Sequence, residues 1–333
     1  MLLEVKNLSV EYITSEGRGY AVENASFKIE EGQIVGLVGE SSSGKSTLGW
    51  SIIRLLPSNA RIRSGDILLK GRDIIKMSER TLNETIRGKE ISVIVQDPQN
   101  ALNPVFTIHT QINDILSLYR KKTRKTKLPL LELFRSADTE RKKEAVSLLT
   151  KVGIADARRR IDEYPYCFSG GMKQRVMMVM AFVVNPSLLI ADEPTTGLDV
   201  TVEAQILEHL KDLIRQYGTA VLYITHDLAV ISEVADKVMV MYAGNIVEIA
   251  NKSELFDSPL HPYTKALIKC LPRNATQKDE LETIPGSVPN IFNLPHGCKF
   301  HPRCELAKQI CKGKRPLLKR NHSSSHEVAC FLV

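Results

Sequence analysis

Short apolar runs recur along the chain and end at polar residues, a pattern that predicts buried strands. These runs cover residues 34–38, 93–95, 188–191 and 221–225. The run at 188–191 is unbroken, as in a parallel strand buried on both faces. Nearer the N-terminus, strand-like segments separated by turn signals cover residues 2–5, 8–12 and 21–30. The pattern therefore predicts a core that contains several strands.

Other segments carry helical or hairpin patterns. Residues 107–166 have leucines at helical spacing and few Gly or Pro, which predicts mostly helix with a basic loop or helix end at 121–135. Helices are also expected to start at 47–53 and 176–182. Residues 236–242 and 246–249 predict a hairpin around the turn at 243–245. Pro and polar residues increase over 274–294, which indicates a linker.

Composition bounds the class of protein. A chain of 333 residues, 43% hydrophobic and 25% charged, fits one large and one smaller globular domain. The N-terminal residues do not show a basic region followed by an apolar core, so a secretory signal is not expected. The most apolar stretch, 176–191, is interrupted by Asn185-Pro186 and is too short to span a bilayer. We expect a cytoplasmic protein, whose membrane-spanning partners, if any, are other chains.

The formal charge of +7 gathers in short runs at 120–125 and 158–160. Such runs can attract nucleic acid or anionic lipid. No aromatic residues interleave with them, as single-strand binders require, so solvated loops and helix faces are favoured. No nucleic-acid partner is expected.

The stretch 39–46 matches G-x-x-x-x-G-K-[ST], a phosphate-binding loop. It lies between a predicted strand and a predicted helix, the context that the motif needs. Main-chain N–H groups would cradle phosphates, Lys45 would reach the β- and γ-phosphates, and Ser46 would ligate Mg²⁺. The predicted nucleotide-binding residues are Gly39, Glu40, Ser41, Ser42, Ser43, Gly44, Lys45, Ser46 and Thr47.

Polar side chains at the ends of the later strands are candidates for chemistry. Gln96 can offer its carbonyl to Mg²⁺ or its amide to a water, and Asp192 can hold the Mg²⁺ shell. Glu193 can polarise a water, and His226 lies where ligands bind at the edge of a parallel sheet. Taken singly, each is equally a solvated or structural polar residue.

A Ser-Gly-Gly turn precedes the helix expected at 176–182 and forms a second main-chain anion site. It comprises Ser169, Gly170, Gly171 and Met172. Tyr12, at the end of a predicted strand, is an ordinary strand tyrosine or a platform for an adenine ring.

A polar turn at Gly197-Leu198-Asp199 follows the two carboxylates. With this turn, the seven motifs from Tyr12 to His226 resemble, in their order, those of an ATP-binding-cassette ATPase. The resemblance implies a P-loop nucleotide hydrolase of the α/β class, with a RecA-like core, an antiparallel β subdomain and a helical subdomain at about 97–180. The cassette would occupy residues 1–256 and a smaller extension 257–333. ATP and Mg²⁺ are the implied ligands.

The resemblance also assigns roles. Tyr12 would stack on adenine, and Ser46, Gln96 and Asp192 would surround Mg²⁺. Glu193 would be the general base or water-orienting group, and His226 would contact the γ-phosphate. The Ser-Gly-Gly turn would complete the ATP site of a second cassette. Because Glu193 and His226 are both present, hydrolysis is expected.

Two positions depart from the common pattern. Ser42 stands where the family most often has Gly, so it must tolerate a loop conformation that Gly adopts more easily. Met172 replaces the commoner Gln, a change that peptide importers often carry. Neither departure predicts inactivation.

The region after the hairpin narrows the resemblance. His261-Pro262-Tyr263 resembles the segment that follows the cassette in importers of oligopeptides and dipeptides. Such an ATPase would work with a second cassette, usually a different chain, with two membrane-spanning permease subunits and indirectly with an extracellular substrate-binding protein. It would be peripheral, on the cytoplasmic face of the membrane. Alternatives are an importer of nickel, opines or sugars, or a cassette ATPase outside transport.

Four cysteines cluster near the C-terminus, at Cys298, Cys304, Cys311 and Cys330. In a reducing compartment they suggest a metal site more than disulfides, although the spacing matches neither common zinc nor ferredoxin patterns. The resemblance implies a [4Fe-4S] cluster, with Zn²⁺ as the alternative. Nearby histidines that could substitute as zinc ligands are His296, His301, His322 and His326. Cys167 and Cys270 stand apart and are expected to be buried thiols.

Overall fold

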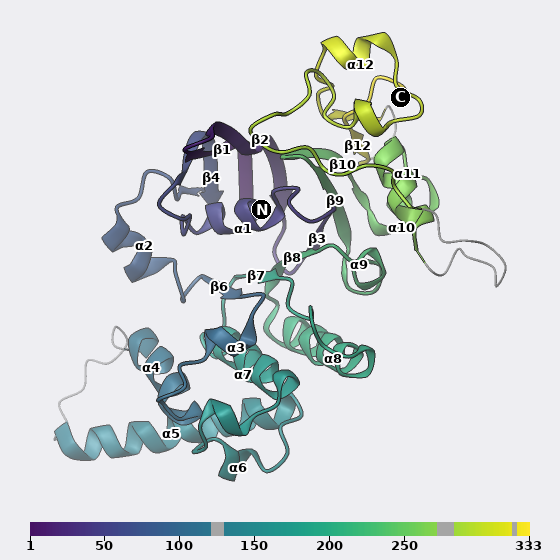
Figure 1. Ribbon diagram of the computed structural model, residues 1–333. Coiled ribbons are helices and arrows are strands. Elements are labelled where there is room, and N and C mark those ends of the chain that lie inside the picture. Colours follow the sequence, from purple (N-terminus) through teal and green to yellow (C-terminus); the bar gives the residue numbers. More distant parts are fainter. Residues whose placement is uncertain (121–129, 272–282, 322–324) are drawn as a thin grey trace. The chain divides into compact units, whose positions relative to one another are not determined.

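The computed structural model describes residues 1–120, 130–271, 283–321 and 325–333 (Figure 1). The chain forms two compact units, one made of Met1–Met77 with Leu222–Val333 and the other of Ser78–Val221. Much of the basic run at 120–125, part of the linker predicted at 274–294, and His322 lie outside the described residues.

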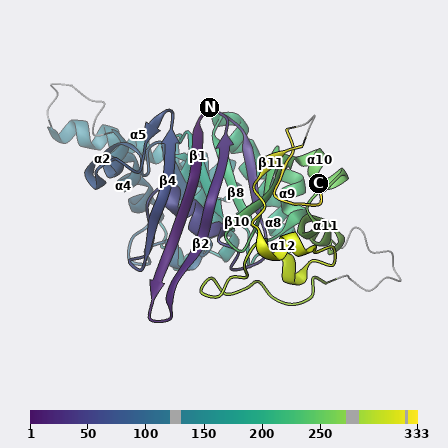
Figure 2. The ribbon, with the colours of Figure 1, turned by 90° about the horizontal axis from the view of Figure 1, so that it is seen from above.

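The first unit contains an antiparallel sheet in the order β2-β1-β4-β5. Its strands are β1 (Leu3–Thr14), β2 (Gly17–Ile29), β4 (Ala60–Leu69) and β5 (Arg72–Asp73). Figure 2 shows the three long strands side by side. The segments predicted at 2–5 and 8–12 form one strand, because register shifts between Val5 and Val10 absorb the interruption. Asn7 lies in that irregular stretch at φ 48°.

A second set of strands in this unit has the order β11-β12-β10-β9-β3-β8. The strands are β3 (Ile34–Val38), β8 (Ala220–Thr225, of which Leu222–Thr225 belong to this unit), β9 (Lys237–Tyr242), β10 (Asn245–Asn251), β11 (Lys319–Arg320) and β12 (Glu327–Val328). β3 runs parallel to β9, and β9 and β10 form the predicted hairpin. Its turn places Ala243 at φ 43° and Gly244 at φ 80°, as a tight hairpin turn requires.

Short helices complete the first unit. They are α1 (Lys45–Ile52), α9 (Leu228–Val234), α10 (Lys252–Asp257), α11 (Pro262–Lys269) and α12 (Gln309–Gly313), with a 3₁₀ turn at His301–Arg303. α9 packs closely on β3. A Cβ at Gly36 would come 2.7 Å from Ile231 Cδ1, so glycine permits this approach.

The second unit pairs β6 (Ile91–Ile94) in parallel with β7 (Leu188–Asp192). Its helices are α2 (Glu79–Thr85), α3 (Pro98–Ala101), α4 (Ile108–Arg120), α5 (Leu130–Lys151), α6 (Ala157–Arg160), α7 (Gly170–Phe182) and α8 (Val200–Tyr217), with a 3₁₀ turn at Pro165–Cys167. The helical prediction for 107–166 is confirmed over most of its described part. Within the described ranges, no helix combines the length and the apolar composition needed to cross a bilayer.

Candidate functional site

The phosphate loop of the first unit joins β3 to α1 and lies against neighbouring backbone. A Cβ at Gly39 would come 2.1 Å from the carbonyl oxygen of Met241, and one at Gly44 would come 2.1 Å from that of Ala21. Gly44 also has φ 101°, which side chains rarely allow. Both glycines are therefore required by space, and Gly44 by backbone conformation as well.

The loop wraps around the buried side chain of Lys45. The Lys45 ammonium donates to the carbonyl oxygens of Gly39 at 2.7 Å and Glu40 at 2.8 Å, and lies 3.5 Å from Ser43 Oγ. The N-cap residue of α1 is Gly44, which has no side chain to cap the helix, and no acidic residue lies in the first turn. A positive helix end beside a cation forms a setting for phosphate.

Ser42 adopts φ 64°, in the left-handed region. The expectation that this serine occupies a conformation better suited to glycine is confirmed. A left-handed residue with a Cβ costs roughly 1–2 kcal/mol, so the rest of the loop must hold Ser42 in place.

Two other predicted residues, Tyr12 and His226, belong to the first unit. The Tyr12 hydroxyl lies 3.4 Å from Thr47 Oγ1, which brings the aromatic ring beside the start of α1. His226 directly follows β8, the strand next to β3 in the sheet.

In the second unit, Glu193 follows β7 at φ 47°. Its Oε2 accepts from Gln96 Nε2 at 3.1 Å and from Thr196 Oγ1 at 3.0 Å. The structure thus brings together Gln96 and Glu193, which are distant in sequence. Strained backbone of this kind persists where surrounding contacts impose it, and it concentrates at functional sites. Asp192, one residue earlier, is 4% exposed.

The Ser-Gly-Gly turn begins α7. Ser169 caps the helix by accepting from the Met172 N–H at 3.3 Å. A Cβ at Gly171 would lie 2.7 Å from Val202 Cγ1 in α8, whereas one at Gly170 would meet nothing closer than 3.8 Å. Asp199, just before α8, caps that helix through the Val202 N–H at 3.0 Å. Gly171 therefore permits close packing of the two helix starts.

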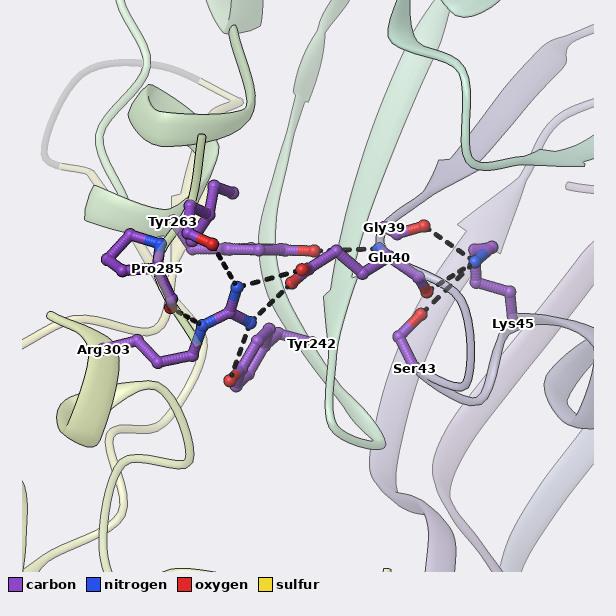
Figure 3. A network of polar contacts seen from close by, with 9 residues as sticks. Gly39, Glu40, Ser43, Lys45, Tyr242, Tyr263, Pro285 and Arg303 are labelled. Atoms are coloured by element: carbon purple, nitrogen blue, oxygen red, sulfur yellow. Dashed lines mark hydrogen bonds and ion pairs between the residues drawn. The ribbon is translucent and has the colours of Figure 1, made fainter. Parts of the chain in front are cut away.

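The phosphate loop takes part in a network of contacts with three residues that were not predicted as site residues, Tyr242, Tyr263 and Arg303 (Figure 3). Tyr263 Oη accepts from the Glu40 N–H at 2.9 Å, and Arg303 forms a two-pronged ion pair with the Glu40 carboxylate. The Arg303 guanidinium also lies over the Tyr242 ring, 5.7 Å from its centroid. The sequence singled out Tyr263 only through its resemblance to a family segment, and no spacing or motif pointed to Arg303.

The segment that carries Tyr263 is anchored by a buried carboxylate. Glu248, fully buried, accepts from the N–H groups of Leu260 at 2.7 Å and His261 at 3.0 Å, and lies 2.6 Å from His326 Nε2. His261 Nδ1 accepts from the Tyr263 N–H at 3.0 Å and so caps α11. Burial lowers the pKa of His261 to about 4, which keeps the ring neutral.

The four clustered cysteines, Cys298, Cys304, Cys311 and Cys330, line one small cavity, together with residues that include His261 and His301. Burial raises the pKa of Cys298 to about 11 and also raises the pKa values of Cys304 and Cys330. Among the residues described, no three His, Cys, Asp or Glu side chains are arranged as a metal-holding group.

Two cysteine expectations are wrong. Cys167 is exposed and Cys270 is partly exposed, instead of buried. Cys167 lies in a short 3₁₀ turn before α7, and Cys270 directly follows the last turn of α11. Both positions leave the thiols near solvent.

A glycine-bounded phosphate loop between a strand and a helix is typical of a P-loop nucleotide hydrolase, and the Glu193 carboxylate follows a separate buried strand. Residues 22–196 match the family described as "ABC transporter", and residues 247–311 match "Oligopeptide/dipeptide transporter, C-terminal region". The chain belongs to the ATP-binding-cassette family of transporter ATPases.

Relatives and solved structures agree with this assignment. The chain is 45% identical to the oligopeptide transport ATP-binding protein AppD of Bacillus subtilis, over 99% of this chain and 96% of that protein. It is 43% identical to OppD of Salmonella typhimurium, over 99% and 93%. The dimeric, ADP- and phosphate-bound cassette MJ0796 is 25% identical, with a TM-score of 0.63 over 75% of this chain and 98% of that one.

Proposed function

We propose that this chain is the ATP-hydrolysing subunit of an importer of di- or oligopeptides. The observation that carries the proposal is the combination of a carboxylate held after a buried strand with a peptide-transporter C-terminal region. Glu193 is held by Gln96 and Thr196, and residues 247–311 match that region. The cassette match supplies the ATPase class, and the C-terminal match supplies the substrate class.

The phosphate loop and Lys45 bind the phosphates of ATP, with Tyr12 stacking on adenine. The predicted Mg²⁺ ligands belong to different units, Ser46 to the first and Gln96 and Asp192 to the second. The glycines that the loop's packing requires support a backbone cradle at this position. Mg²⁺ would neutralise charge on the phosphates and help to orient them.

Glu193 takes a proton from the attacking water, or orients that water, and His226 contacts the γ-phosphate. The Gln96 amide and the Thr196 hydroxyl both donate to one Glu193 oxygen, which holds the carboxylate in one orientation. A positioned general base of this kind contributes about 10²–10⁴-fold to rate.

The partners follow from the importer class. Ser169, Gly170, Gly171 and Met172 complete the ATP site of a second cassette, most simply a different chain. The helical part between Gln96 and Ser169 docks on two membrane-spanning permease subunits, and an extracellular protein delivers the peptide. The chain would then lie on the cytoplasmic face of the membrane as a peripheral subunit, with the cassette at 1–256 and the extension at 257–333. No nucleic acid takes part.

We also infer that Cys298, Cys304, Cys311 and Cys330 hold a [4Fe-4S] cluster, with Zn²⁺ as the alternative. Four soft sulfur donors around one cavity fit either group chemically. The thiols must lose protons to bind it, and burial opposes this loss at Cys298, Cys304 and Cys330, whose pKa values it raises. The test is the iron content and absorption spectrum of anaerobically purified protein. Zinc without iron would overturn the cluster assignment.

The experiment for the ATPase compares wild type with Glu193→Gln, using Glu203→Gln in the first turn of α8 as a matched control. We expect a loss of at least about 10²-fold in turnover for the first variant only. Unchanged turnover would remove Glu193 from its role.

The experiment for transport measures uptake of a labelled tripeptide by cells that lack this chain. Wild type should restore uptake, and Glu193→Gln should not. Restored ATPase activity without peptide uptake would favour the alternative, an importer of nickel, opines or sugars, or an ATPase outside transport.

A further inference from the structure

Arg303 lies in the C-terminal segment (residues 257–333) and contacts Glu40 of the phosphate loop, which is 263 residues earlier in the sequence. Its Nη1 lies 2.7 Å from Glu40 Oε2, and its Nη2 lies 3.0 Å from Glu40 Oε1. The Arg303 side chain is 6% exposed, whereas that of Glu40 is 28% exposed. A two-pronged, mostly desolvated pair of this kind is directional, unlike ordinary surface ion pairs.

The remaining donors of Arg303 are also engaged (Figure 3). Nε donates to the Pro285 carbonyl at 2.7 Å, Nη2 to the Ile284 carbonyl at 3.2 Å, and Nη1 to the Tyr242 hydroxyl at 3.4 Å. A guanidinium has five N–H groups in a planar fork, and the acceptors here match that number. A lysine ammonium, with three donors on a compact centre, cannot reproduce this set.

The Arg303 guanidinium packs against Tyr242, which belongs to a cluster of three aromatic rings. The Tyr242 ring lies 4.7 Å from that of Tyr263 and 5.1 Å from that of Phe300, measured between centroids. Tyr242 ends β9, Tyr263 lies in the first turn of α11, and Phe300 immediately precedes the 3₁₀ turn that carries Arg303. Close packing of three rings from separate segments fixes where the guanidinium can lie.

Glu40 is held at three points. Its carboxylate meets Arg303, its N–H donates to Tyr263 Oη at 2.9 Å, and its carbonyl accepts from Lys45 Nζ at 2.8 Å. Two of these three contacts come from the C-terminal segment. The third comes from the lysine that the proposed function assigns to the phosphates. The orientation of Glu40 therefore links the C-terminal segment to the cation of the nucleotide site.

We propose that Arg303 is a positioning residue for nucleotide binding, which acts by holding Glu40 and thereby setting the phosphate loop around Lys45. This role rests on the proposed ATPase function. It predicts that the C-terminal segment is part of the support of the nucleotide site.

The test measures MgATP affinity, KM for ATP, kcat and the unfolding midpoint of the full chain. Arg303→Met should raise the dissociation constant and KM by about tenfold, within the range usual for coupled sites, with kcat at saturating ATP near wild type. The dissociation constant and KM of Arg303→Lys should lie between those of wild type and Arg303→Met. Glu40→Gln combined with Arg303→Met should bind no more weakly than Arg303→Met alone, because both remove one contact.

The matched control is Arg315→Met. Arg315 comes from the same C-terminal segment, but it pairs with the Glu23 carboxylate at 2.9 Å and donates to the Glu23 carbonyl, so that its partner lies in β2 and not in the phosphate loop. This variant should leave MgATP affinity within twofold of wild type. A merely structural role for Arg303 would lower the unfolding midpoint and kcat together and leave KM unchanged.

Three results would overturn the proposal: tenfold weakening by Arg315→Met, additive losses in the Glu40 and Arg303 double variant, or Arg303→Met and Arg303→Lys binding MgATP within twofold of wild type. If Arg303→Met fails to fold, Arg303→Lys alone decides, because it keeps the charge and loses the fork. Failure of the wild-type chain to bind MgATP would instead refute the proposed function.

Discussion

Gly171 offers a sharp test of the packing at the start of α7. Substitution by alanine places a Cβ 2.7 Å from Val202 Cγ1, a distance that real side chains do not tolerate. Val202 is β-branched and lies in a helix, where such side chains strongly prefer one rotamer. It therefore cannot turn away cheaply, and either the rotamer or the two helices must shift.

The magnitude is a difference between two effects. Overpacking of this kind costs about 1–3 kcal/mol, whereas alanine in place of glycine in a helix gains up to about 1 kcal/mol. Gly171→Ala should therefore destabilise the protein by up to roughly 3 kcal/mol. In a Val202→Ala background the clash is gone, and the same substitution should become neutral or stabilising. The coupling energy between the two sites is expected to be about 1–3 kcal/mol.

The assay is urea unfolding of the four members of this cycle. Gly170→Ala is the matched control, because its Cβ would meet nothing closer than Gln99 Nε2 at 3.8 Å. The change in the free energy of unfolding caused by Gly170→Ala should be the same with and without Val202→Ala. A coupling below about 0.5 kcal/mol for Gly171 would show that the close contact with Val202 does not determine its stability, and would refute the reasoning.

Three further predictions test other sites. His261→Asn should remove a pH dependence of stability. Burial lowers the pKa of His261 to about 4 from an ordinary 6.5, so the unfolded chain binds a proton more readily than the folded one in this range. The free energy of unfolding of wild type, measured by chemical unfolding, should therefore fall by about 3 kcal/mol relative to that of the variant between pH 6.5 and 4. Gly44→Ala should abolish MgATP binding in a fluorescent-nucleotide titration, since its Cβ would come 2.1 Å from the Ala21 carbonyl; wild-type affinity would contradict the packing. Arg175→Ala should cost about 1–3 kcal/mol in urea unfolding, because it removes donors to the Val152 carbonyl at 2.6 Å and to Gln205 at 2.8 Å; a change under 0.5 kcal/mol would contradict this.

The strands and helices near the motifs were predictable because their signals are local. Apolar runs marked β3, β7 and β8, and turn chemistry marked the hairpin of β9 and β10. The left-handed serine at position 42 was predictable because the motif places glycine there in other cassettes. The fusion of the two predicted short strands into the single strand β1 was not predictable, because bulges depend on the partner strands and leave no local sequence pattern.

Part of the site could not be read from the sequence. The grip on Glu40 depends on long-range packing of Arg303 and Tyr263, residues with no motif spacing relative to the phosphate loop. Nothing local in the sequence likewise marks Glu248 as buried, although it contacts Leu260, His261 and His326 at 12, 13 and 78 residues along the chain. Single-residue patterns carry no information on such pairings.

The interleaving of the two units affects the order of folding during synthesis. The Ile34 N–H donates to Asp236, 202 residues later, and the neighbours of β3 are β8 and β9. At ribosomal rates of about 5–20 residues per second, the strand before the phosphate loop waits roughly 10–40 s for its partners. The inserted unit, Ser78–Val221, emerges in full during that interval. Its folding can precede that of the nucleotide-binding strand, which leaves an apolar segment in need of protection by chaperones until the later strands arrive.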